Sequence, residues 1–136
     1  YLFSNDSDLQ RHETDILKFV DPGRNTFKNI HRRAQRLILD WLNKNGYVDI
    51  YDNKFDKFIF VDIDEVKEWS TYMVLKLIFQ GIKNDENDVF QEKYEHYAAE
   101  EKATRQRALL RLDLDRDGNN DTNEGIRVMS GNIFVR

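Results

Sequence analysis

Hydrophobic residues recur at intervals of three and four over most of the chain, which is the spacing of one face of an α-helix. The pattern is strongest from Thr26 to Lys44, where it predicts an amphipathic helix. Asn25 is the expected N-cap of this helix, and Gly46 is placed to end it in a left-handed conformation. Its apolar stripe comprises Phe27, Ile30, Ala34, Leu37, Ile38, Trp41 and Leu42.

The pattern before this helix is weaker. It predicts a helix from Asp8 to Val20 with only a partial apolar face and with Ser7 as its N-cap. The tripeptide Asp21-Pro22-Gly23 is expected to end it, because proline cannot continue the helical hydrogen bonds and glycine favours a turn.

The third predicted helix, from Ile63 to Gln80, is apolar around most of its circumference. Asp62 and Glu65 have the spacing of a capping box at its start, and Gly81 is its expected stop. A helix of this kind needs cover on all sides, so it either runs through the middle of a bundle or also contacts another subunit. The residues that we expect at such a subunit contact are Trp69, Tyr72 and Phe79.

The last predicted helix, from Val89 to Leu112, is the longest and the most charged. Glu101 interrupts its apolar stripe, and ionised side chains crowd its other faces. Two interpretations fit this pattern. The helix is either a solvated surface helix with ion pairs four residues apart, or an arm that projects towards a partner.

Short apolar runs outside the helices indicate β-structure. Phe58–Val61 is either a short strand or a loop held by its aromatic residues, and Ile126–Met129 with Ile133–Val135 predicts a hairpin. The predicted fold is therefore mainly α. A small bundle of about four helices occupies residues 1–112, and an acidic loop and β tail at 113–136 pack on the same domain or on a neighbouring subunit.

Composition narrows the class of protein. The chain has 136 residues, of which 40% are hydrophobic, enough for the core of one domain. The absence of cysteine excludes disulfides and thiolate metal sites. A net charge of −4 argues against a general nucleic-acid coat. Because no apolar run reaches transmembrane length and the N-terminus lacks a signal-peptide pattern, we expect a soluble protein made in a cytoplasm, with no membrane partner.

The clearest motif is the acidic sequence DLDRDGNNDTNE at residues 113–124. Its spacing resembles that of an EF-hand calcium loop, in which alternate oxygen ligands converge on one ion. Asn120 stands where such loops usually carry a branched apolar residue, and no exiting helix is expected after Gly125. The motif is either a single structural Ca²⁺ site or a hydrated acidic turn. The candidate ligands are Asp113, Asp115, Asp117, Asn119, Asp121 and Glu124.

Other chemical signatures are weak. The three histidines, His12, His31 and His96, are far apart in sequence and do not form a zinc motif. His31 lies at the edge of an apolar stripe, where a core histidine is more usual than a metal ligand. The chain has no phosphate-binding loop, dinucleotide fingerprint or nucleophile elbow, so we assign no catalytic residues and expect no enzyme activity.

A basic segment lies on the strongest predicted helix. Arg32 and Arg36 point away from the apolar stripe, and Arg33 lies on its flank. These side chains either contact phosphate or an acidic protein surface, or form an ordinary solvated helix face.

The order of segments from Leu9 to Leu112 resembles the head–tail connector (adaptor) proteins of tailed bacteriophages. The resemblance rests on an amphipathic helix that ends in LNKNG, then DIDEVKEWSTYMVLKLIF from Asp62, and then FQEKYEHY from Phe90 ahead of a long charged helix. It implies a helical bundle without enzymatic residues that binds beneath the portal ring and extends the DNA channel towards the tail.

This resemblance implies specific partners and a location. A portal protein, tail or neck proteins, and further copies of the chain in a ring are the expected partners, with DNA passing through without sequence-specific binding. The expected location is the neck of the virion, after assembly in the host cytoplasm. The C-terminal tail is expected to add a strand to a neighbouring subunit or to the portal. Its expected contact residues are Ile126, Val128, Ile133, Phe134 and Val135.

Two other classes of function stay open. The first is a small calcium-binding interaction module that uses the acidic segment 113–124. The second is a small enzyme or a nucleic-acid binder, which for nucleic acid requires salt-dependent binding through Arg32 and Arg36.

Overall fold

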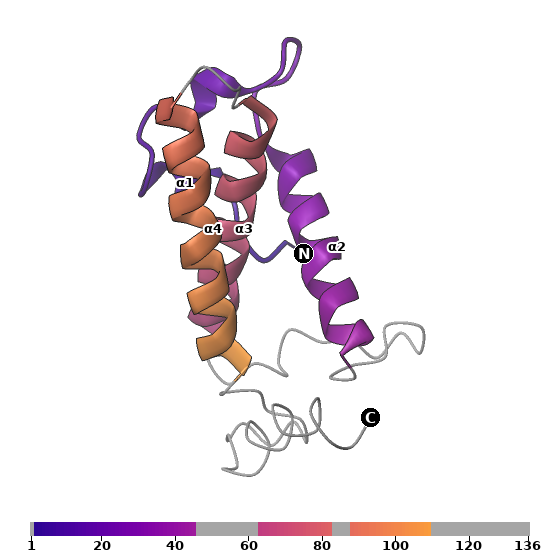
Figure 1. Ribbon diagram of the computed structural model, residues 1–136. Coiled ribbons are helices and arrows are strands. Elements are labelled where there is room, and N and C mark those ends of the chain that lie inside the picture. Colours follow the sequence, from indigo (N-terminus) through magenta and orange to yellow (C-terminus); the bar gives the residue numbers. More distant parts are fainter. Residues whose placement is uncertain (1, 46–62, 83–87, 110–136) are drawn as a thin grey trace.

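Three long helices lie side by side in the computed structural model, which describes residues 2–45, 63–82 and 88–109. They are α2 (Lys28–Lys44), α3 (Ile63–Ile82) and α4 (Asp88–Leu109). Figure 1 shows α3 between the other two, with α2 and α4 running in one direction and α3 in the other. The prediction of a mainly helical bundle is confirmed.

The β-structure that the sequence predicts lies outside this description. Within the three described ranges the chain forms helices and turns but no strand. Phe58–Val61, Ile126–Met129 and Ile133–Val135 fall elsewhere in the chain, as does Gly46, the expected end of α2.

The position of α3 between α2 and α4 explains why its sequence is apolar around most of its circumference. Val66, Trp69 and Val74 of α3 are completely buried in a single chain, because α2 covers one side of the helix and α4 covers the other. The interpretation that this helix runs through the middle of the bundle is therefore confirmed.

Aromatic rings fill much of the core on both sides of α3. The Trp69 ring meets the Trp41 ring of α2 edge to face, with centroids 6.1 Å apart. Phe79 stacks on Tyr97 and Phe90 of α4, with centroid distances of 5.8 and 6.1 Å. Such pairs add about 0.5–1.5 kcal/mol each beyond the burial of their area, so they hold α3 against both neighbours.

The N-terminal region differs from its prediction. The long helix expected over 8–20 is replaced by a short α1 (Asp6–Gln10) and a 3₁₀ turn, η1 (Ile16–Phe19). The N-cap of α1 is Asn5 rather than Ser7, because Asn5 and Asp8 form a reciprocal capping box. This box starts the helix earlier than the apolar pattern indicated.

The connection into α2 confirms one prediction and corrects another. Gly23 has a φ of +86°, and the Arg24 amide donates to the Asp21 carbonyl, so the expected turn is present. Asn25, however, is not the N-cap. The cap residue is Phe27, whose own side chain makes no capping bond.

The other two long helices begin within one residue of their predicted starts, and the predicted end of the last helix at Leu112 lies outside the described residues. α3 continues through Gly81 to Ile82, so glycine does not stop it as expected. The described part of α4 packs along α3 for its length, which argues against a projecting arm. Among the described residues, Arg105 and Glu101 form an ion pair at four-residue spacing within this helix. Lys93, Glu101 and Arg107 pair with residues outside it.

Candidate functional site

Most of the predicted site residues lie outside the described ranges. The candidate calcium ligands and the expected contact residues of the tail all lie beyond residue 109. Among the residues that the structure does describe, no group of three or more histidine or acidic side chains is placed to hold a metal. The calcium site and the tail contact therefore stay predictions.

The three predicted contact residues of α3 are placed very differently. Trp69 and Phe79 are both 0% exposed inside a single chain, so neither has surface to offer a partner in this conformation. Tyr72 is only partly buried. Tyrosine is enriched at protein interfaces because its ring buries apolar area while its hydroxyl stays hydrogen-bonded. Among these three residues, only Tyr72 has exposed surface left for the predicted contact, which stays a prediction.

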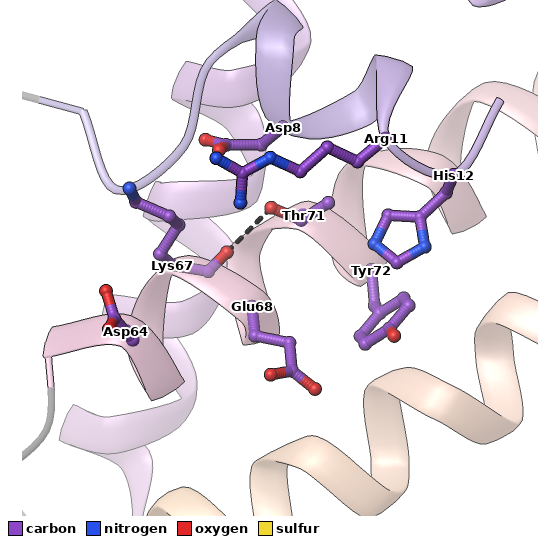
Figure 2. Close-up of a pocket in the computed structure, with 8 residues that line it drawn as sticks. All are labelled: Asp8, Arg11, His12, Asp64, Lys67, Glu68, Thr71 and Tyr72. Atoms are coloured by element: carbon purple, nitrogen blue, oxygen red, sulfur yellow. Dashed lines mark hydrogen bonds between the residues drawn. The ribbon is translucent and has the colours of Figure 1, made fainter. Parts of the chain in front are cut away.

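Tyr72 lies at the edge of a charged groove between α1 and the first half of α3 (Figure 2). The groove has a volume of about 610 Å³. Side chains from α1 and the residues just after it face side chains from α3 across it. Its lining residues are Asp8, Arg11, His12, Asp64, Lys67, Glu68, Thr71 and Tyr72.

Several polar groups of this groove also support the local fold. Asp8 accepts from the Asn5 amide in the capping box, and Thr71 donates to the Lys67 carbonyl at 2.8 Å. Glu68 accepts from Arg107 of α4 at 3.0 Å. The exposed edge therefore combines an aromatic surface with both signs of charge, which suits a protein contact better than one small ion.

A second set of contacts attaches the loop after α1 to α4. Glu13 accepts hydrogen bonds from the Tyr97 hydroxyl at 2.5 Å and from Lys93. The rings of Tyr72 and Tyr97 stack with centroids 6.2 Å apart, and His12 packs against Tyr72 at 5.0 Å. These contacts fix one wall of the groove.

Both tyrosines stay neutral in this setting. Burial raises the pKa of the Tyr97 hydroxyl well above its ordinary value, and its hydrogen bond to Glu13 raises it further. Burial also raises the pKa of Tyr72, and the nearby Glu68 carboxylate adds to that effect. Neither hydroxyl is therefore primed to lose a proton near neutral pH.

A buried polar network joins the N-terminal segment to the bundle. Ser4 hydrogen-bonds to the Nδ1 of His31 on α2 and to Ser70 on α3, both at 2.7 Å. The Nε2 of His31 lies 3.1 Å from an Asp6 oxygen. An ionised carboxylate only accepts, so Nε2 carries the proton and Nδ1 accepts from Ser4. The network thus ties three segments together through a neutral imidazole.

Asp6 also supplies the missing cap of α2. Its carboxylate accepts from the Phe27 amide at 3.2 Å and from the Thr26 hydroxyl at 2.5 Å. An acidic group at a helix N-terminus is stabilised by the free amides and by the helix dipole. No local pattern predicted this role, because Asp6 reaches α2 only through the tertiary fold.

The Ser4, His31 and Asp6 side chains share the composition of a hydrolytic triad but not its setting. His31 is 1% exposed and Ser4 is 3% exposed, so a substrate has no access to the hydroxyl. Burial lowers the pKa of His31 from its ordinary 6.5, although Asp6 opposes the shift. We interpret the network as structural, which agrees with the expectation that His31 belongs to the core.

Glu101, which interrupts the apolar stripe of α4, is also buried and fully engaged. It is 2% exposed and accepts from Trp69 Nε1 at 2.9 Å. Lys76 lies 3.2 Å and Arg105 lies 3.4 Å from its two oxygens. A buried carboxylate requires such partners, so Glu101 serves the packing of α3 against α4.

The exposed side of α2 carries what we call the basic face, formed by Lys28, Arg32, Arg33 and Arg36. All four side chains are exposed, and none forms a salt bridge with another residue in the described part of the chain. The predicted outward direction of Arg32 and Arg36 is confirmed.

Comparisons of the chain with known proteins identified no relative. No protein-family model, curated protein or solved structure matches the chain. No helix among the described residues is long and apolar enough to cross a bilayer. A functional proposal therefore depends on the surfaces described above and on the resemblance of the sequence to phage connectors.

Proposed function

We propose that the chain is a structural head–tail connector of a tailed bacteriophage, a subunit of a ring that joins the portal to the tail and continues the DNA channel. The observation that supports this most is the order of packing. The segments that carry the resemblance form α2, α3 and α4 of one bundle, with the apolar segment in the middle.

Two different exposed surfaces add support. A ring built from identical subunits needs a heterologous interface, in which one surface of a subunit meets a different surface of the next. The groove edge around Tyr72 and the basic face of α2 lie on different helices and differ in chemistry. They provide candidates for two such surfaces, or for contacts with the portal and the tail.

A substitution at Tyr72 tests the assembly role. Tyr72→Asp places a charge on the groove edge and is expected to weaken self-association by on the order of tenfold or more, because interface tyrosines often contribute above 1 kcal/mol. Tyr72→Phe keeps the ring contacts with His12 and Tyr97 and is the matched control. The measurement is the distribution of oligomer masses by native mass spectrometry.

A second variant separates assembly from folding. Lys67→Glu changes the charge of the groove without altering the core, because Lys67 is only partly buried. If Tyr72→Asp and Lys67→Glu both fold, as judged by circular dichroism, and both assemble like the unmodified chain, the groove is not an assembly surface. The connector proposal would then depend on the basic face alone.

A further inference from the structure

The basic face of α2 is unlike the charged surface of the other two long helices. Four of the six cations of α3 and α4 pair with carboxylates within the described residues. None of the four cations of the basic face does so. Counting Lys44 and Asp40 as well, the exposed charges of α2 are five cations and one carboxylate, a net +4 in a chain of net −4.

The complementary charge is present in the same sequence. The acidic segment 113–124 contains five carboxylates and one arginine, a net −4 that equals the excess on α2 in magnitude.

We propose that the basic face of α2 binds the acidic segment 113–124 of a second copy of the chain. The proposal rests on the connector function and names the chemistry of its subunit contact. Each copy offers one basic face and one acidic segment, so the contact is heterologous and can close into a ring. Because exposed charges carry it, the contact weakens as salt rises and shortens the screening length.

The observations favour this occupant over nucleic acid. Phosphates also match exposed arginines, but the net charge of −4 disfavours the approach of a polyanion. Every copy of the chain contains one acidic segment for each basic face, so the two are always present in equal numbers. A nucleic-acid partner is the competing outcome of the test.

Two variants of the full chain, each with the charge removed from one surface, provide that test. The first, Arg32→Glu with Arg36→Glu, takes the net exposed charge of α2 from +4 to 0. The second, Asp115→Lys with Asp117→Lys, takes the net charge of the acidic segment from −4 to 0. Each alone removes the net attraction at the contact, so self-association is expected to weaken by on the order of tenfold or more. Native mass spectrometry at low salt measures the masses.

Mixing the two variants gives the decisive result. The first variant keeps a normal acidic segment, and the second keeps a normal basic face, so the mixture has one compatible contact. It is expected to form one-to-one dimers that do not grow further. A chain that carries all four substitutions has no net charge on either surface and is expected to stay monomeric.

The matched control changes the same amount of charge elsewhere. Lys18→Glu with Lys102→Glu alters two exposed cations outside α2 and is expected to leave assembly unchanged. Loss of assembly in this control would show that net charge rather than the basic face is responsible, and would overturn the proposal.

Other outcomes overturn the inference in distinguishable ways. If Arg32→Glu with Arg36→Glu assembles like the unmodified chain, the basic face is not the contact, but the connector function stands. If each variant is monomeric and their mixture forms no dimer, the segment does not bind a second copy. If Arg32 and Arg36 are required for salt-dependent DNA binding but not for assembly, the face binds nucleic acid instead.

Discussion

The two sides of α2 differ in whether their polar and charged side chains have partners. On its inner side, His31 is enclosed with Ser4 and Asp6, and each polar atom of this network has a partner at hydrogen-bond distance. On its outer side, the basic face has no partner among the described residues. Buried polar groups must be paired for the chain to fold, whereas exposed ones need not be. The basic face is therefore the side of α2 that is available to bind another molecule.

The contact between α3 and α4 resembles the inner side of α2. Glu101 is buried there with Trp69, Lys76 and Arg105 around it. We therefore expect substitutions in the enclosed networks to change folding stability, and substitutions on the basic face to change association.

The largest expected effect on stability is at Glu101. Glu101→Ala leaves the buried Trp69 indole N–H without its acceptor and is expected to lower the free energy of unfolding by about 1–3 kcal/mol. Glu101→Gln keeps an acceptor and is expected to cost less. Urea denaturation of the variants measures both values. An equal loss in the two variants would show that the indole hydrogen bond is not the cause.

The next effect is the pH dependence that His31 confers. Its pKa is lowered in the folded state, so below pH 6.5 the unfolded chain takes up a proton that the folded chain resists. The free energy of unfolding is therefore expected to fall as the pH drops below 6.5, with a slope of at most about 1.4 kcal/mol per pH unit from this one group.

Substitution isolates this histidine from the other titrating groups. His31→Gln can keep hydrogen bonds to Ser4 and Asp6 without titrating, so it should reduce the slope measured by denaturation at several pH values. His96 is exposed, so His96→Gln is the matched control for the loss of one imidazole outside the buried network. A slope that survives in His31→Gln would show that other groups carry the pH dependence.

The smallest expected effect on stability is on the basic face. Arg32→Glu with Arg36→Glu is expected to change the free energy of unfolding by no more than about 0.5 kcal/mol, because these exposed cations form no salt bridge with another described residue. Thermal and urea denaturation measure this change. A loss of several kcal/mol would mean that these cations support the fold, and the contrast between the two sides of α2 would fail.

The long helices were predicted well because the signals for them, hydrophobic periodicity and apolar runs, lie within the helical segments themselves. The periodicity of α2 and the apolar run of α3 placed both helices within two residues of their observed bounds. The N-terminal region was harder, since its structure depends on distant partners. Glu13 is held by Lys93 and Tyr97 of α4, and no local pattern records such a contact.

The candidate site was predictable only in part for the same reason. The outward direction of Arg32 and Arg36 follows from helical spacing alone, and the structure confirms it. That Trp69 is enclosed while Tyr72 keeps exposed surface depends on which faces of α3 its neighbours cover. An aromatic pattern on one helix cannot separate these two cases.

Native mass spectrometry of the purified chain, with calcium and then with a chelator, tests the central claim most directly. The connector account predicts one closed ring whose mass is an integer multiple of the subunit mass. The fraction of the chain found in this ring is expected to fall as salt rises. Retention of that mass in chelator would show that calcium is not required for the ring. A monomer under every condition, also when mixed with a phage portal ring, would contradict the account.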